Sequence, residues 1–241
     1  MKTWCDVNTA FVCVACVFVA STIAAAGEGQ KEQRWTFEKV KVGASAPDGW
    51  ITGVTGSEAG NAPWWEVIRD DDRVVLAQLE SGGARGDFPV CLKEDSQFKD
   101  GTVSIRFKPI SGRVDQAGGV VFRAKDKDNF YIARANALEN NVSIYVTQNG
   151  ERKTLKYWDD VPVPLGEWHE LTVEAEGFTF KVKLNGKLVG IIEDMAQSFP
   201  DAGMVGFWTK ADSITLFDGV TISHPGEEPK RAATGQKGKS Q

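Results

Sequence analysis

The strongest constraint in the sequence is an alternation of apolar and polar residues that stops at an Asn-Gly pair. Over residues 178–184, phenylalanine, valine and leucine alternate with threonine and lysine. Successive residues of a strand point to opposite faces, so one face of this segment is apolar. Asn185-Gly186 follows and suits a two-residue hairpin turn, because both residues tolerate positive φ. The pattern predicts an antiparallel hairpin whose second strand covers 188–192.

The same kind of pattern recurs along most of the chain. Asn149-Gly150 predicts a second hairpin between 142–147 and 153–158. Between residues 35 and 222, short apolar runs are separated by glycine, aspartate, asparagine or proline, and no helical period persists. We therefore predict an all-β fold, in which two antiparallel sheets form a sandwich over residues 31–223.

The two ends of the chain differ from this body. Lys2 precedes an apolar run over 10–20, and an Ala24-Ala25-Ala26-Gly27 cleavage pattern follows it. This predicts a signal peptide over 1–26 and a secreted or periplasmic protein. The alternative is a membrane span, but the apolar run is shorter than the ~20 residues that a spanning helix needs. Residues 224–241 have almost no apolar side chains, which predicts a disordered tail.

Composition limits the partners and the stabilising bonds of the predicted domain. The chain is 41% hydrophobic and 25% charged, as in ordinary globular proteins. Its net charge of −5 argues against nucleic acid as a partner, because phosphates call for a basic surface. Cleavage after Ala26 leaves Cys91 as the one cysteine, so the mature chain cannot form an internal disulfide.

Residues 117–147 predict a polar face on the outside of one sheet. Tyr131, Ala133 and Ala135 share a face, and Arg134 and Asn136 lie on the opposite one. Burying an unpaired arginine is very costly, so the alanine side is predicted to face the core.

The neighbouring strands follow the same logic. If Val120 and Phe122 point inward, Arg123 points outward, and an inward Ile144 leaves Ser143 and Tyr145 outward. We expect the two arginines to lie ~5 Å apart on adjacent strands and to need an anionic partner, with Asp115 and Glu139 as the nearest internal candidates.

This predicted face would suit a hydroxyl-rich ligand if the sheet is curved, because it combines guanidinium, amide, hydroxyl and aromatic groups. The candidate ligand-binding residues are Arg123, Arg134, Asn136, Ser143 and Tyr145. The alternative is an ordinary solvated sheet face.

Three segments, 107–145, 166–194 and 199–222, resemble a known family. The runs FKPISGRVDQAGGVVFRAKDKDNFYIARANALENNVSIY, GEWHELTVEAEGFTFKVKLNGKLVGIIED and FPDAGMVGFWTKADSITLFDGVTI resemble exported bacterial proteins of the concanavalin A-like lectin/glucanase fold. These are related to the 3-keto-disaccharide hydrolase domain family, often labelled family-16 glycoside hydrolase-like. The resemblance implies a jelly-roll sandwich with a concave sheet that faces a saccharide or glycoside.

The match to the family's motifs is partial. Gly119 and Arg123 match its GxxxR strand, and Tyr131 matches the tyrosine of its GYExQ-like strand. Ile132 stands in place of the motif glutamate, and Arg134 in place of the glutamine. The E-x-D-x-x-E strand of family-16 glycosidases is absent too, so no acid/base carboxylate pair is evident. Action on (keto-)glycosides is left open, and the alternative is a non-catalytic laminin G-like interaction or structural module.

Metal sites have few candidates, and no cofactor other than a structural calcium is predicted. Asp126 and Asp128 place oxygen ligands in one turn, although such residues also make local hydrogen bonds in hairpins. Asp218 is a second candidate, because the resemblance implies a calcium near the last strand. His169 is one of two histidines and alternates with apolar residues, which favours a packed, hydrogen-bonded role.

Overall fold

A computed structural model describes residues 32–56, 63–80 and 86–225, and every regular element in these ranges is a strand. Sheet A has the order β13 (Lys187–Glu193), β12 (Thr179–Leu184), β11 (His169–Glu176), β6 (Gly101–Ser111), β15 (Ile214–Ser223), β4 (Arg73–Gln78) and β3 (Trp65–Asp70), with β1 (Glu32–Trp35) also paired to β15. Sheet B has the order β10 (Glu151–Trp158), β9 (Asn141–Gln148), β8 (Asn129–Asn136), β7 (Ala117–Asp126), β14 (Gly203–Trp208), β5 (Pro89–Phe98) and β2 (Trp50–Val54).

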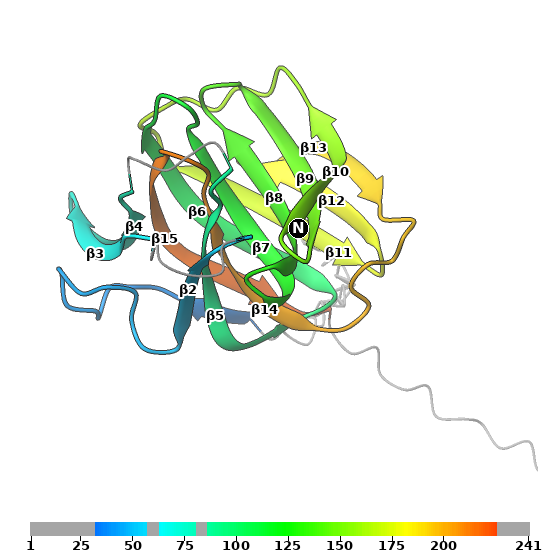
Figure 1. Cartoon of the computed structure of the whole chain (residues 1–241), viewed down its shortest axis with the longest axis horizontal. Helices are drawn as coiled ribbons and strands as arrows, with labels where there is room; N and C mark the ends of the chain where they lie inside the picture. Colours follow the sequence, from blue (N-terminus) through cyan, green and yellow to red (C-terminus); the bar gives the residue numbers. More distant parts are fainter. Residues whose placement is uncertain (1–31, 57–62, 81–85, 226–241) are drawn as a thin grey trace, which may run out of the picture.

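The two sheets form the predicted sandwich. In Figure 1, sheet B lies in front with its outer face toward the viewer, and sheet A lies behind it. All named pairings are antiparallel, including the two predicted hairpins. Asn149, Gly150, Asn185 and Gly186 have φ of 53°, 82°, 50° and 75°, as this turn type requires. The predicted fold class is confirmed.

The core between the sheets contains the side chains that alternation assigned to it. Val120, Phe122, Tyr131, Ala133 and Ile144 all belong to the main buried cluster. Figure 1 shows how the adjacent strands β7, β8 and β9 lie side by side in sheet B, which aligns these inward faces. Their outward faces are therefore aligned as well.

Several register shifts interrupt the alternation in sheet B, and two of them, β-bulges on β7 and β10, lie beside its polar side chains. On β7 the register shifts between Phe122 and Asp126, and Arg123 there has φ of 49°. On β10 the register shifts between Thr154 and Lys156, which leaves Leu155 as an extra residue. An extra residue bends a strand and re-aims the side chains beside it. Both bulges change what sequence alternation alone would predict.

The predicted signal peptide over 1–26 and nearly all of the predicted tail lie outside the described residues. Within the described part, no helix is long and apolar enough to cross a membrane. Cys91 is a free thiol in the core, and burial raises its pKa.

Candidate functional site

The outer face of sheet B brings polar side chains from several strands into one row. Trp208 pairs with Gly119, and Gly119 pairs with Arg134. Arg134 pairs in turn with Ser143, and Ser143 with Tyr157 of β10. A β-carbon on Gly119 would lie 2.9 Å from the backbone oxygen of Ala133 and 2.9 Å from Ile132 Cδ1, so close packing requires glycine between Trp208 and Arg134.

Glu139, in the connection between β8 and β9, organises one end of this row. Its Oε2 accepts hydrogen bonds from Arg134 Nη2, Asn136 Nδ2, Asn141 Nδ2 and the Tyr157 hydroxyl, each at 3.0 Å. Burial would raise the pKa of Glu139, but these donors and the arginine charge outweigh it and lower the pKa to about 2. Glu139 is therefore a carboxylate at neutral pH.

Arg134 is buried, with 3% of its side chain exposed. Its Nε lies 3.1 Å from Ser143 Oγ and its Nη2 binds Glu139. Its Nη1 lies 3.7 Å from Asp115 Oδ1, and this nitrogen makes no hydrogen bond within the described residues. Burial acts to lower the pKa of Arg134, but Tyr145, Asp115 and Glu139 reverse this and raise it. The guanidinium is thus hydrogen-bonded on one side, and on the other it has only the ion pair with Asp115.

Asn136, Ser143 and Tyr145 lie beside Arg134, as the sequence predicted. Asn136 Oδ1 accepts from the backbone nitrogens of Leu138 and Glu139, so this side chain shapes the turn that carries Glu139. Ser143 Oγ donates to the Tyr145 hydroxyl at 2.9 Å. Four of the five candidate residues therefore share one site, and their role in ligand binding stays a prediction.

The expected position of Arg123 is wrong. The bulge on β7 turns this side chain toward the end of sheet A, where it lies over the rings of Phe178 and Phe180, each 5.4 Å away. It donates to the backbone oxygens of Lys99, Phe199 and Gly177 and lies 3.3 Å from Asp100. Arg123 and Arg134 do not form an adjacent pair.

Arg152 of β10 belongs to the site, although alternation did not predict it. Its guanidinium carbon lies 4.3 Å from the ring centre of Tyr145, 4.5 Å from Phe88 and 5.5 Å from Trp208. Five positions separate Arg152 from Tyr157, so strict alternation would put them on opposite faces. The extra residue at Leu155 returns both to the outer face. Phe88 and Trp208 come from distant parts of the chain and carried no local signal.

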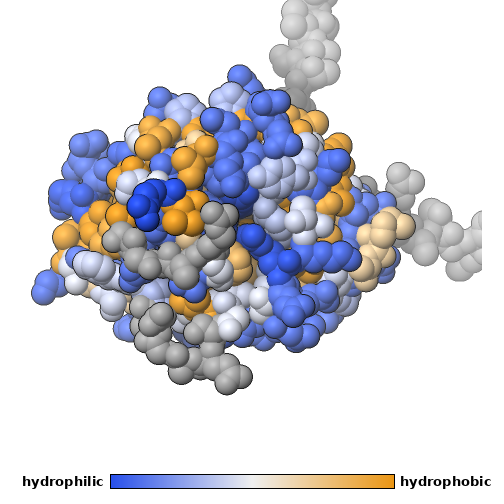
Figure 2. Space-filling model, turned by 45° about the horizontal axis from the view of Figure 1, so that its top comes forward, coloured by the Kyte–Doolittle hydropathy of each residue, from blue (hydrophilic) through white to orange (hydrophobic). Residues whose placement is uncertain are grey.

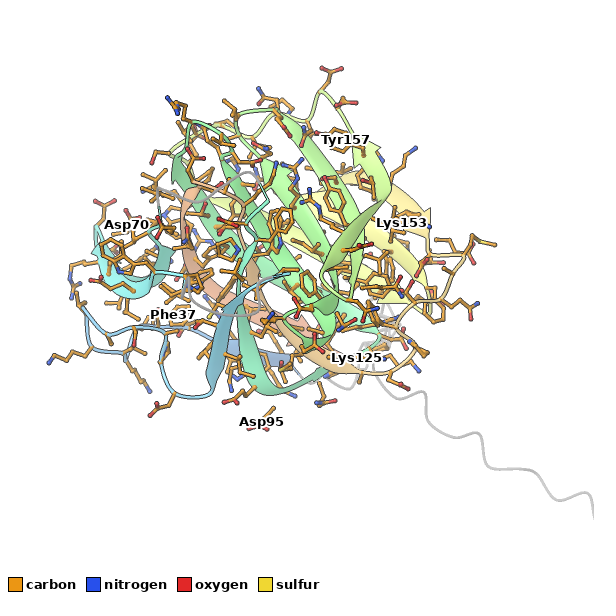
Figure 3. All side chains as sticks on the ribbon, in the orientation of Figure 1. Phe37, Asp70, Asp95, Lys125, Lys153 and Tyr157 are labelled. Atoms are coloured by element: carbon orange, nitrogen blue, oxygen red, sulfur yellow. The ribbon has the colours of Figure 1, made fainter. Side chains whose placement is uncertain are left out.

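Several buried polar atoms on this face lack partners. Within the described residues, no hydrogen bond is made by Arg134 Nη1, Asn141 Oδ1, Arg152 Nη1 or Trp208 Nε1. Tyr157 borders the site on β10, which pairs with β9 and is the edge strand of sheet B (Figure 3). Figure 2 shows a surface on which hydrophilic and hydrophobic residues are interspersed. Buried polar groups are normally hydrogen-bonded, so this concentration marks the outer face of sheet B as the candidate site.

The carboxylates of the calcium candidates contact protein donors. Asp218 Oδ2 accepts from Arg73 at 2.6 Å and Arg106 at 2.8 Å. Asp126 Oδ1 accepts from the backbone nitrogen of Asp128, whose own Oδ2 lies 2.7 Å from Lys127. Among the described residues, no group of three or more histidine, cysteine or acidic side chains could hold a metal. Calcium binding stays a prediction for metal analysis.

His169 has the packed role that its pattern favoured. Its ring lies 5.4 Å from that of Phe107, with Nε2 2.8 Å from the backbone oxygen of Pro164 and Nδ1 3.2 Å from Asn185 Nδ2. These partners occupy both ring nitrogens at the β12–β13 hairpin. His169 therefore supports the fold and lies outside the site.

The fold and the site define the class of protein: it is a concanavalin A-like jelly-roll sandwich with a polar and aromatic face on one sheet. The sequence model of the 3-keto-alpha-glucoside-1,2-lyase-like domain family matches residues 36–223. The chain belongs to this family, as its motifs indicated.

Comparisons with individual proteins agree with this assignment. The chain is 28% identical to a levanase of Bacillus subtilis (strain 168) over 205 residues, which cover 82% of this chain and 27% of the levanase. It thus spans about a quarter of that relative's length.

Two solved structures share the fold. The carbohydrate-binding module CBM66 from Bacillus subtilis has a TM-score of 0.56 and 23% identity, over 73% of this chain and 96% of that one. A beta-glucanase of Bacillus licheniformis has a TM-score of 0.53 and 11% identity, over 83% of this chain and all of that one (100%).

Proposed function

We propose that the protein is an exported saccharide-binding domain whose ligand lies on the outer face of sheet B. The observation that carries the proposal is the set of buried donors and acceptors around Tyr145, Phe88 and Trp208 that make no hydrogen bond to any residue the structure describes. Saccharides offer hydroxyl groups that both donate and accept, and their apolar faces contact aromatic rings. A bound sugar would satisfy these polar atoms.

The relatives support the same ligand class. The matched family is described by its action on a keto-glucoside, and a structure of similar fold is a carbohydrate-binding module. The similarity to that module indicates a common fold, and the ligand class is proposed from the site itself. The rigid pairing of Arg134, Asn136 and Glu139 supports it, because ordered donors lose little freedom on binding.

Binding is favoured over hydrolysis by the state of the carboxylates. A general acid must be protonated near the working pH, but the low pKa of Glu139 keeps it ionised. Asp115 is fully buried and binds Asn136 and Lys210. The position of the motif glutamate holds Ile132, which packs in the apolar cluster of this face. The proposed domain therefore holds a saccharide without a built acid and base.

A glycan array tests the proposal. The mature domain should bind at least one class of oligosaccharide, and Arg134→Gln should weaken that binding at least tenfold. Lys181→Gln is a matched control, because this lysine is exposed on sheet A. Failure of the folded protein to bind any glycan would contradict the proposal, and capture of a protein ligand instead would support the laminin G-like alternative. N-terminal sequencing of exported protein should give a start near Gly27, and recovery of Met1 would contradict export.

A further inference from the structure

Arg152 is the one feature of the site that neutral sugar binding does not explain. Within the described residues it has no hydrogen bond and no ion pair, and its Nη1 is buried. Burial lowers the pKa of Arg152 and the nearby charge of Arg134 acts in the same direction, and together they outweigh Tyr145, Asp115 and Glu139, which act to raise it. An isolated charge is costly to bury, so a partner of opposite charge is expected.

The acidic side chains of the site are already paired with other cations. Glu139 binds Arg134, and Asp115 binds Lys210. Each of these carboxylates is thus paired with a cation, and Arg152 has no paired carboxylate among the described residues. The site therefore carries an excess positive charge, although the whole chain has a net charge of −5.

The aromatic rings hold Arg152 in place without neutralising it. Three ring centres lie 4.3–5.5 Å from its guanidinium carbon. Such contacts attract a cation through the ring quadrupole, but they use the faces of the guanidinium and leave its N–H groups unbonded. Arg152 is partly exposed, so the N–H groups other than the buried Nη1 remain available along the edge of the planar group, where a carboxylate binds in bidentate geometry.

We propose that the ligand is an acidic saccharide whose carboxylate pairs with Arg152, a proposal that rests on the saccharide-binding function above. The Arg134 guanidinium carbon lies 5.9 Å from the same Tyr145 ring, so its Nη1, which has an ion pair with Asp115 but no hydrogen bond, belongs to the same area. A uronic acid residue has the required chemistry: a planar carboxylate beside hydroxyl groups on an apolar ring. The hydroxyl groups contact the remaining polar atoms, Asn141 Oδ1 and Trp208 Nε1.

Calorimetry with three matched trisaccharides tests the charge preference. They carry a terminal glucuronate, its methyl ester, or a terminal glucose, and are titrated into the mature domain at pH 7. The glucuronate form should bind at least tenfold more tightly than the other two, and the difference should shrink at high salt. Arg152→Gln should reduce the difference to less than twofold.

Lys153→Gln is the control, because it removes the same charge from the adjacent residue. Lys153 is exposed and pairs with Val146, whose side chain is in the core, so it lies on the other side of β10 from the site (Figure 3). This variant should keep the full preference for glucuronate. The melting temperature of Arg152→Gln should be no lower than that of the parent, because glutamine needs no counter-charge.

The outcomes separate this proposal from the one on which it rests. Equal binding of all three trisaccharides would overturn the acidic ligand and leave saccharide binding in place. Absence of binding to them and to every glycan of the array would overturn both. A marked drop in melting temperature for Arg152→Gln, with unchanged selectivity, would show that Arg152 serves packing alone.

Discussion

Arg123 and Arg152 are both arginines of sheet B that lie against aromatic rings, but their hydrogen bonds differ completely. Arg123 donates to three backbone oxygens and pairs with Asp100. Arg152 has no such partner within the described residues. A buried cation with all its acceptors supplied by the fold is structural, whereas one without them is available to a ligand. Arg123 is fully buried and Arg152 only partly, but the clearest difference between them lies in their hydrogen-bond partners.

The largest expected effect is at Arg123. Arg123→Ala should lower the free energy of unfolding by about 3–5 kcal/mol, because it leaves buried acceptors without a donor. Chemical denaturation measures this loss. Lys125→Ala on the same strand is the control, because Lys125 is exposed and should change stability by less than about 0.5 kcal/mol. A stable Arg123→Ala protein with impaired glycan binding would show that Arg123 serves ligand binding and is not structural.

The loss of stability expected for Arg134→Ala lies between those expected for Arg123→Ala and Lys125→Ala. The hydrogen bonds of Arg134 to Glu139 and Ser143 are charge-assisted, so Arg134→Ala should cost about 1.5–3 kcal/mol of stability. This is more than a surface arginine would give, because the pairing with Glu139 is part of the fold. Saccharide binding should be lost as well, measured on protein that is still folded. Retained binding would remove Arg134 from the site.

The pH dependence of stability should report on Glu139. Its pKa is lowered from 4.5 to about 2 in the folded state, so its contribution is present above pH 4.5. That contribution is lost as the pH falls toward 2, because protonation removes the ion pair. Thermal melts of the parent and of Glu139→Gln should differ at pH 7 and converge near pH 2. A difference that stays constant across this range would mean that the ion pair contributes nothing.

The smallest expected effect is at Tyr157. Its hydroxyl donates to Glu139 and accepts from Asn141, but the side chain is 38% exposed. Tyr157→Phe should therefore cost only about 0.5–1 kcal/mol of stability, measured by denaturation. If Tyr157 contacts the ligand, its loss should weaken glycan binding more than this change in stability accounts for. If glycan binding weakens by no more than the change in stability, Tyr157 has a structural role and does not contact the ligand.

Alternation and turn residues were enough to predict the fold, because they act locally. The Asn-Gly hairpins, the inward faces of β7, β8 and β9, and the outward Arg134, Asn136, Ser143 and Tyr145 all follow from period two. The predicted outward position of Arg123 failed at the bulge on β7, and the bulge at Leu155 kept alternation from identifying Arg152.

Long-range pairing could not be predicted either. Phe88 and Trp208 reach the site because β14 inserts between β7 and β5. No local pattern in the sequence encodes that strand order. A residue such as Arg152, whose surroundings depend on both a bulge and this order, was beyond sequence reasoning.

The bulge at Leu155 also has a consequence for how such domains can diversify. If Leu155 joined the ladder as a regular residue, the bulge would disappear, and Arg152 and Lys153 would exchange faces relative to Tyr157. The site would then receive a lysine in place of an arginine, with no codon for either residue altered. A one-residue change of register in an edge strand can therefore change ligand preference between relatives in a single evolutionary step, and aligned sequences alone would not reveal the residue responsible.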